Sequence, residues 1–299
     1  MKKMIALVMA ISMSLAMLAG CGSTAATETA KSTAEAAVDT AETTETESEA
    51  AEAEAAAGTL LAKIQESGKI VVGTASGYPP YEFIDITSPN QDVIGIDMAL
   101  AQAIADELGV ELEIQDMSFS SLLAALPAHT IDVAIAGISP TDERKETMDF
   151  SDNYIDTEQK VIILKENADK YKTIDDFKGE TMAAEKSTTQ EALIQELLPE
   201  CPITSLERVP DCILELVGGK AAGVVVEGVV GEQYLMTNDN LQFSDASFER
   251  EKHSAIALEK GNEDLLEIMN AVIQANKDNG NFDAWITEYS EKANSNAAE

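Results

Sequence analysis

Two consecutive series of short strands and helices run along the chain from residue 60 onward, and this alternation restricts the fold more than any other feature. The predicted strands lie at 69–73, 111–115, 131–136, 161–164, 181–184, 203–209, 222–226, 241–243 and 254–258, and the predicted helices at 98–108, 120–126, 190–198, 211–217, 263–276 and 282–289. Such alternation predicts mainly parallel sheets covered by helices. Two series in one chain therefore predict an α/β protein with two lobes.

The helix at 98–108 carries boundary signals at both ends. Asp97 is a residue type that caps helix N-termini, and Gly109 suits the left-handed conformation that often ends a helix. The apolar run at 131–136 predicts a central parallel strand. Because ligands of open α/β sheets bind at the carboxyl ends of such strands, the residues after it are the first candidates for a site.

The segment 136–144 reads Ala-Gly-Ile-Ser-Pro-Thr-Asp-Glu-Arg and combines groups suited to an acidic ligand. Gly137 lets the backbone approach a ligand, Ser139 and Thr141 offer hydroxyls at a helix start, and Arg144 can hold a carboxylate through two donors. A helix cap followed by a surface arginine is the alternative. These residues alone leave both interpretations open.

The N-terminus is typical of an exported protein. Lys2 and Lys3 precede an apolar stretch at 4–19, which is shorter than the roughly 20 residues of a membrane-spanning helix, so a cleaved signal peptide at 1–20 is favoured over an anchor. Residues 18–21, Leu-Ala-Gly-Cys, resemble the bacterial lipobox, which implies acylation of Cys21 and attachment to the lipid bilayer. Residues 21–58, which are rich in Ala, Glu and Thr, then form a disordered acidic tether.

The net charge excludes one class of partner, and the cysteines leave two alternatives open. The chain has 54 acidic and 20 basic side chains, a formal net charge of −34, so a nucleic acid partner is excluded. Beyond Cys21 only Cys201 and Cys212 remain, which an exported protein could join in a disulfide or keep as two buried thiols. The sequence predicts no metal site and no cofactor.

Several motifs together resemble the family 3 solute-binding proteins of polar amino acid ABC transporters. The segment 136–144 followed by Asp-Phe-Ser-Asp-Asn-Tyr at 149–154 is similar to the family signature. Residues 72–74, 78–83 and 94–97 are similar to its opening strand, aromatic loop and first helix, and 187–191 to its second-lobe Gly-Thr-Thr loop, with Ser187 in the glycine position. The resemblance covers about residues 60–292.

The resemblance implies a type 2 periplasmic-binding-protein fold, in which a two-stranded hinge near 154–159 and 244–247 joins two α/β lobes. Lobe 1 would comprise 59–154 plus 248–292, lobe 2 would comprise 155–247, and 293–299 would form a C-terminal tail. Arg144, Ser139 and Thr189 would bind the α-carboxylate of an amino acid. The Gly137 carbonyl and the Glu227 carboxylate would receive its α-ammonium. The implied ligand-binding set is Tyr78, Tyr81, Phe119, Ala136, Gly137, Ser139, Arg144, Thr188, Thr189 and Glu227, with Tyr78, Tyr81 and Phe119 as the aromatic wall.

Three further residues bear on selectivity. Family members that take lysine or arginine often carry Asp where this chain has Ala75, so the resemblance favours a neutral or modestly polar amino acid, glutamine-like or cysteine-like. Glu185 could pair with a basic side chain or face water. Val226 suggests an apolar contact.

The resulting expectation is a monomeric, lipid-anchored binding protein that delivers an amino acid to an ABC permease, and not an enzyme. It would lie on the outer face of the cytoplasmic membrane, at the cell surface of a Gram-positive bacterium or the periplasmic side of a Gram-negative one. An amino-acid-sensing lipoprotein is the first alternative. A dehydratase or lyase on the same fold is the second, although the chain has only His129 and His253 and no hydrolase or metalloprotease motif.

Overall fold

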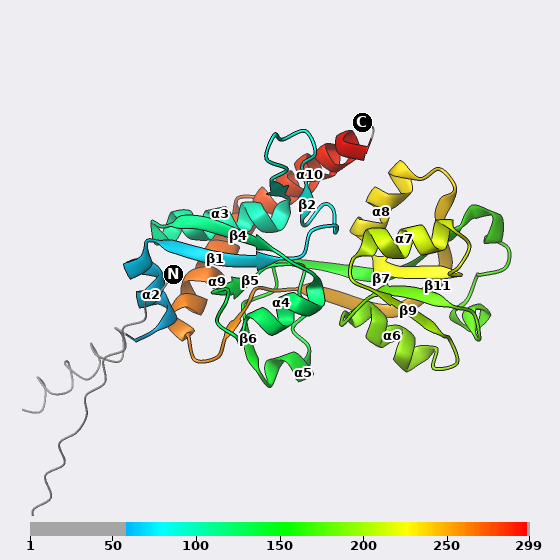
Figure 1. Ribbon diagram of the computed structural model, residues 1–299, viewed down its shortest axis with the longest axis horizontal. Helices are drawn as coiled ribbons and strands as arrows, with labels where there is room; N and C mark the ends of the chain where they lie inside the picture. The colour runs from blue at the N-terminus through cyan, green and yellow to red at the C-terminus, as the bar shows by residue number, and fades with distance from the viewer. Residues whose placement is uncertain (1–57, 298–299) are drawn as a thin grey trace, which may run out of the picture. The chain divides into compact units, whose positions relative to one another are not determined.

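The computed structural model describes residues 58–297, which form two lobes, each built on a five-stranded sheet (Figure 1). The elements of lobe 1 are α2 (Leu60–Ser67), β1 (Lys69–Thr74), β2 (Phe83–Ile84), β3 (Val93–Ile94), α3 (Ile96–Leu108), β4 (Glu111–Asp116), α4 (Phe119–Ala125), β5 (Val133–Ala134), α5 (Asp142–Lys145), β6 (Met148–Phe150), β12 (Ala257–Glu259), α9 (Glu263–Asp278) and α10 (Asn281–Ala297). Those of lobe 2 are β7 (Ile155–Leu164), β8 (Met182–Glu185), α6 (Thr189–Leu197), β9 (Ile203–Leu206), α7 (Val209–Val217), β10 (Gly223–Glu227), α8 (Gly228–Thr237) and β11 (Leu241–Ser254).

Both sheets are mixed, with a parallel centre. In lobe 1 the strand order is β4-β1-β5-β12-β6, and β1 runs parallel to β4 and β5. In lobe 2 the order is β11-β7-β10-β8-β9, and β8 runs parallel to β9 and β10. The alternating pattern of the sequence therefore predicted the fold class correctly. The parallel strands of each lobe end together, which gathers the loops that follow them.

The strand pair β7 and β11 joins the lobes and runs from the middle of Figure 1 into lobe 2. Its register pairs Ile155 with Ser254 and Lys160 with Ser247. Glu251 to Ser254 therefore lie opposite the predicted first hinge segment, whereas the predicted second segment at 244–247 meets β7 near Lys160, further into lobe 2. The strand β11 is longer than predicted and continues past a register irregularity on each side of Ser247.

The observed helix boundaries show which local sequence signals predicted the start or end of a helix correctly. Gly109 ends α3 in the left-handed conformation, with φ of 69°, as predicted. Asp97 is not the N-cap, because α3 already begins at Ile96 and Asp97 lies buried in its first turn. No helix was predicted at α8, because its buried Val230, Gly231 and Gln233 do not form the one-sided apolar stripe that reveals a surface helix. The last helix, α10, continues beyond the predicted end at 289 to Ala297.

Packing of the two cysteines excludes the disulfide alternative. Cys201 and Cys212 are both free and buried, and they belong to different hydrophobic clusters. The Cys201 thiol lies 2.9 Å from the carbonyl oxygen of Phe177, while Cys212 lies on α7 against the core that includes Val224. Of the two alternatives that the sequence left open, the structure therefore shows two buried thiols.

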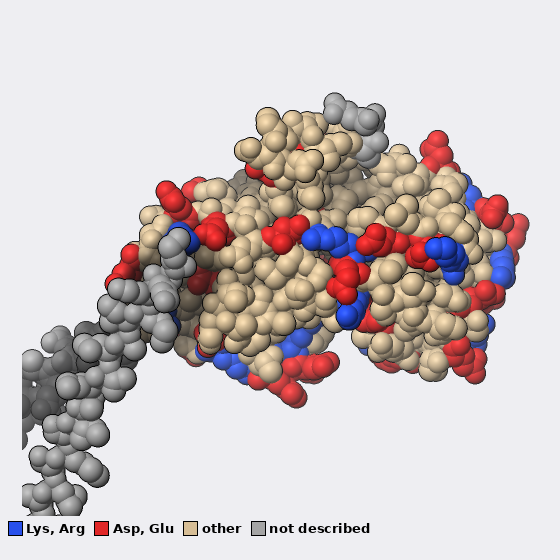
Figure 2. All heavy atoms as spheres, in the orientation of Figure 1, with Lys and Arg blue, Asp and Glu red and all other residues tan. Residues whose placement is uncertain are grey.

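The predicted signal peptide, the acylated Cys21 and all but the last residue of the tether lie outside the described residues. Within 58–297 no helix is both long and apolar enough to span a membrane. On the face in Figure 2, Asp and Glu side chains are spread over both lobes with Lys and Arg between them. This surface gives no sign of a patch for one particular charged partner.

Candidate functional site

One cavity is lined by residues of both lobes, at the carboxyl ends of β1, β5 and β8 and the start of α4, α5 and α6. Its volume is about 20 Å³, which is room for roughly one water molecule. The lining residues are Ala75, Tyr78, Glu82, Phe119, Ala136, Gly137, Ser139, Arg144, Glu185, Thr188, Thr189, Gln190 and Lys252. Eight of the ten residues predicted to bind ligand are in this set; Tyr81 and Glu227 lie directly behind it.

Arg144 is a cation on one side of the cavity. Its guanidinium donates to the carbonyl oxygens of Ser139 and Ser187, each at 2.9 Å, and lies 5.2 Å from the centre of the Phe119 ring. Desolvation by burial lowers the pKa of Arg144 to about 10, so it stays protonated at neutral pH. Among the ion pairs of residues 58–297, none involves Arg144. Its charge is thus left for an anion from outside the protein.

Thr141 settles the alternative interpretation of this segment. Its hydroxyl accepts a hydrogen bond from the Arg144 backbone N–H at 3.3 Å and caps α5. The segment therefore contains a helix cap, but Arg144 lines the cavity and is not a surface arginine.

The loop at Gly137 is fixed from behind by a buried carboxylate. Asp97 accepts hydrogen bonds from the Gly137 backbone N–H at 2.8 Å and from the Tyr154 hydroxyl at 3.0 Å. Burial raises the pKa of Asp97 to about 7, against the opposing effect of these hydrogen bonds. Gly137 has φ of 53°, and a Cβ at this position would lie 3.4 Å from Lys252 and 3.6 Å from Glu227. These are ordinary contact distances, so it is the left-handed turn that requires glycine at this position.

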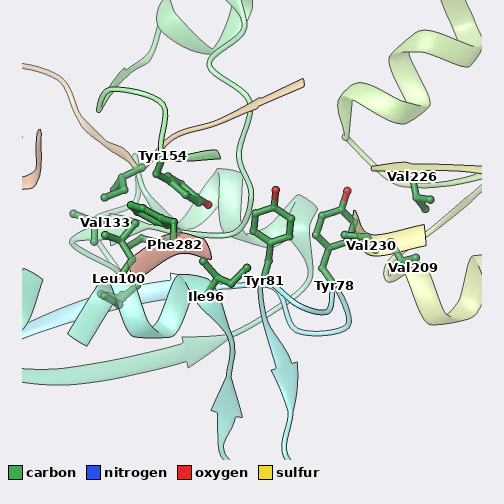
Figure 3. Packing of buried hydrophobic residues seen from close by; sticks show 14 of the residues in the cluster. Tyr78, Tyr81, Ile96, Leu100, Val133, Tyr154, Val209, Val226, Val230 and Phe282 are labelled. Atoms are coloured by element: carbon green, nitrogen blue, oxygen red, sulfur yellow. The ribbon is translucent and has the colours of Figure 1, made fainter. Parts of the chain in front are cut away.

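A buried ionic cluster of Glu227 and Lys252 lies beside Gly137. Glu227 is fully buried and accepts hydrogen bonds from the Tyr78 hydroxyl at 3.0 Å and the Tyr81 hydroxyl at 2.8 Å. Lys252, 4% exposed, forms an ion pair with Glu227 and donates to the Gly137 carbonyl. In Figure 3 the Tyr78 and Tyr81 rings lie side by side with their hydroxyls pointing the same way. The two tyrosines thus hold the carboxylate, and of the three residues predicted as an aromatic wall, Tyr78 and Phe119 line the cavity while Tyr81 lies behind it.

The lobe 2 loop places polar groups at the start of α6. Ser187 has φ of 65°, in the left-handed region that favours glycine. This backbone conformation explains why glycine is the usual residue at this position of the second-lobe loop in the family that the motif resembles. Thr188 caps α6 and donates to the Glu185 carbonyl at 2.6 Å, so its hydroxyl is already engaged. The Thr189 hydroxyl is close to Gln190, at 3.3 Å. Gln190 in turn donates to the Tyr78 hydroxyl at 3.1 Å and links the lobes.

Two of the three candidate selectivity residues line the cavity. Glu185 is buried, and burial raises its pKa to about 8, with Arg208 acting in the opposite direction. Ala75 leaves the adjacent wall without a charge. Val226 is fully buried in the hydrophobic core and does not line the cavity, since the strand β10 directs it into the lobe. Glu185 is therefore the one carboxylate among the predicted selectivity residues that is available to a ligand side chain.

Sequence reasoning missed three lining residues. Glu82 lies within the aromatic motif at 78–83 and Gln190 within the loop motif at 187–191, so both could have been nominated from the resemblance. Lys252 lies in Phe-Glu-Arg-Glu-Lys-His-Ser, a run typical of a solvated strand, and gave no such signal. Burial raises the pKa of Glu82 well above its usual range, with Asp97 adding to the shift.

The fold and this interlobe site define the class of protein: a type 2 periplasmic binding protein. Residues 70–292 match the model of the bacterial extracellular solute-binding proteins, family 3, and the chain belongs to this family. It is similar to the arginine-binding extracellular protein ArtP of Bacillus subtilis, with 33% identity over 74% of this chain and 88% of ArtP. It is also similar to the L-cystine-binding protein TcyJ of Escherichia coli, with 30% identity over 75% of this chain and 84% of TcyJ.

A solved structure gives the same result. The amino acid ABC transporter substrate-binding protein AbpA of Streptococcus pneumoniae, bound to L-arginine, superposes with a TM-score of 0.75 at 32% identity. The match covers 77% of this chain and 98% of AbpA. The resemblance stated from the motifs is therefore confirmed for the family and for the fold.

Proposed function

We propose that this protein binds an amino acid between its lobes, through the α-carboxylate and the α-ammonium, and delivers it to an ABC permease. The observation that carries the proposal is Arg144, a partly buried cation that lines the cavity without an acidic partner among residues 58–297. A carboxylate is the group that a guanidinium binds best, since two parallel N–H donors match its two oxygens. Ser139 and Thr189, one from each lobe, complete this half of the site.

The other half of the proposed site suits an ammonium. The Glu227 carboxylate and the Gly137 carbonyl converge on one point, which a cationic nitrogen already occupies in this structure. A group with three donors and one positive charge can satisfy both. An amino acid presents a carboxylate and an ammonium on one carbon, so it matches both halves.

For the side chain of the ligand we propose a basic group, with arginine as the first candidate. Glu185 is buried beside the cavity, and its raised pKa reports a carboxyl group that lacks sufficient counter-charge. A guanidinium or ammonium on the ligand would supply that charge. The chain has Ala75 where family members that take lysine or arginine often carry Asp. Because Glu185 can supply a carboxylate in place of that Asp, Ala75 no longer implies a preference for a neutral ligand. ArtP and AbpA, which bind arginine, support the same choice.

Export and anchoring are part of the proposal. The apolar stretch at 4–19 and the lipobox-like residues 18–21 support acylation of Cys21, which would hold the binding domain at the outer face of the cytoplasmic membrane. An amino-acid sensor would have the same anchor and site. Uptake of labelled arginine by cells that lack the protein separates the two, because only a transport protein is needed for uptake.

Calorimetric titration of ligand-stripped protein with arginine, cystine and glutamine tests the proposal. We expect arginine to bind, and Arg144→Ala to weaken binding by about 30-fold to 100-fold, because the lost charge-assisted contact contributes about 2–3 kcal/mol. Lys69→Ala is the control, since Lys69 forms an exposed ion pair with Glu113 at the end of β1 away from the cavity. Equal affinity of the Arg144→Ala variant and wild type would remove Arg144 from the site.

A further inference from the structure

Lys252 occupies the position that the proposed function assigns to the ligand ammonium. Its Nζ forms an ion pair with Glu227 and donates to the Gly137 carbonyl and, at 3.0 Å, to the Ser254 hydroxyl. These three contacts use all three hydrogens of a lysine ammonium. The same nitrogen lies 5.7 Å from the centre of the Tyr81 ring. The subsite is thus filled by a side chain of the protein itself.

A second ammonium cannot be added beside the first. Glu227 also accepts hydrogen bonds from Tyr78 and Tyr81, so both of its oxygens are already engaged. Two like charges around one carboxylate repel each other in a site that excludes water. The cavity volume of about 20 Å³ leaves no space for an amino acid while Lys252 and Arg144 remain where they are.

The structure also offers Lys252 another location. The residue lines a second cavity of about 350 Å³ next to the first. That cavity is open to solvent on one side and includes the carboxylates of Glu196 and Glu251. A long, flexible lysine side chain can turn from one cavity to the other without a change in the backbone. Its charge would be solvated there beside Glu251, while Glu196 is already paired with Arg250, which lines the same cavity.

We propose that Lys252 is a tethered competitor for the ammonium subsite. This inference rests on the proposed function: without ligand, Lys252 neutralises Glu227 and fills the subsite, and the α-ammonium of an arriving amino acid displaces it into the second cavity. The exchange replaces one ammonium by another, so the ligand gains little net affinity from its amino group. Lys252 thereby shifts selectivity towards the carboxylate and the side chain of the ligand.

Titration of the mature protein with arginine and with 5-guanidinopentanoate, which is arginine without the α-amino group, tests the inference. We expect wild type to bind the two compounds with affinities within about tenfold of each other. In Lys252→Met, which leaves Glu227 without its cation, we expect arginine to bind at least about tenfold tighter and the analogue to show no gain. Lys69→Met is the matched control, because Lys69 forms an exposed ion pair with Glu113 at the other end of β1.

A measurement on the wild-type protein tests the inference even if the Lys252→Met variant fails to fold. The ammonium nitrogen of Lys252, detected by NMR in protein with labelled lysine, is held by three acceptors and gives a protected signal without ligand. We expect arginine to abolish that signal and 5-guanidinopentanoate to leave it in place. A signal that survives arginine binding would overturn the displacement.

The remaining outcomes separate the inference from the proposed function. If wild type binds arginine and Lys252→Met binds it equally or more weakly, the competitor role is wrong and the proposed function stands. If only Lys252→Met binds arginine, competition is supported in an extreme form. If neither protein binds arginine or any other amino acid, both proposals fail.

Discussion

Ligand binding is expected to be coupled to the release of a proton from Glu185. Its pKa is raised from an ordinary 4.5 to about 8, so at pH 7 roughly nine in ten molecules carry it protonated. The charged groups that act on it are Arg208, which lowers the pKa, and Glu207, which raises it. A guanidinium bound beside Glu185 favours the ionised form. Binding of arginine at pH 7 is therefore expected to release about 0.9 proton.

The raised pKa of Glu185 also determines how the affinity for arginine depends on pH. The logarithm of the association constant rises with pH by the number of protons released, so arginine affinity is expected to increase about tenfold between pH 6 and pH 7 and to level off above pH 8. Asp97, with a pKa of about 7, titrates in the same range but does not face the ligand side chain. Comparison with Glu185→Gln isolates the contribution of Glu185.

Calorimetry in buffers of different ionisation enthalpy measures the released protons directly. We expect about 0.9 proton for wild type at pH 7, close to none for Glu185→Gln, and a wild-type value for Glu180→Gln, whose exposed carboxylate pairs with Lys170. Proton release that persists in Glu185→Gln would refute the assignment of Glu185 to the ligand side chain.

The free protein provides a second check with a definite sign. Because the folded state holds a proton on Glu185 between pH 4.5 and 8 and the unfolded state does not, the free energy of unfolding contains a contribution that falls as pH rises through this window. The Gln variant lacks the titrating group. Its stability curve is therefore expected to be flatter over the same range in thermal unfolding.

Two further predictions follow from the lobe interface and the lobe 2 loop. Arg208 forms an ion pair with Asp116 at 3.1 Å across the lobes, so Arg208→Ala is expected to weaken arginine binding less than tenfold, and to raise the pH at which Glu185 titrates, both by calorimetry; an unchanged pH profile would contradict the coupling. Ser187→Gly is expected to stabilise the protein by up to about 1 kcal/mol in thermal unfolding, since φ of 65° strains a serine; a lower melting temperature would show that the flexibility of glycine in the unfolded chain outweighs that strain.

Local sequence signals predicted those parts of the fold that local physics determines. The strand at 69–73, the end of α3 at Gly109 and the alternation of strands and helices were predicted, because each depends on a few consecutive residues. The length of β11 was not predicted, since it depends on pairing with β7 and its sequence is charged. The helix α8 was missed because burial on several sides removes the one-sided pattern.

The candidate site divides in the same way. Arg144 and Gly137 stand in one motif, and the spacing of that motif was sufficient to nominate them. The link from Asp97 to Gly137 spans 40 residues and the link from Lys252 to Glu227 joins two strands of lobe 2, so neither can be read from neighbouring residues. Buried ionic contacts of this kind depend on tertiary structure, in which a charged residue in a polar run becomes an internal counter-ion.

Asp97 has a mechanical role that follows from its two hydrogen bonds. The same carboxylate holds the backbone of Gly137, which lines the cavity, and the hydroxyl of Tyr154, the residue just before the crossing strand β7. The Tyr154 hydroxyl also contacts the Gly137 N–H at 3.1 Å, so the three groups form a closed triangle. Asp97 therefore links the cavity loop at Gly137 to the start of β7, the strand that joins the lobes, so a ligand that shifts Gly137 is expected to shift the start of β7 with it.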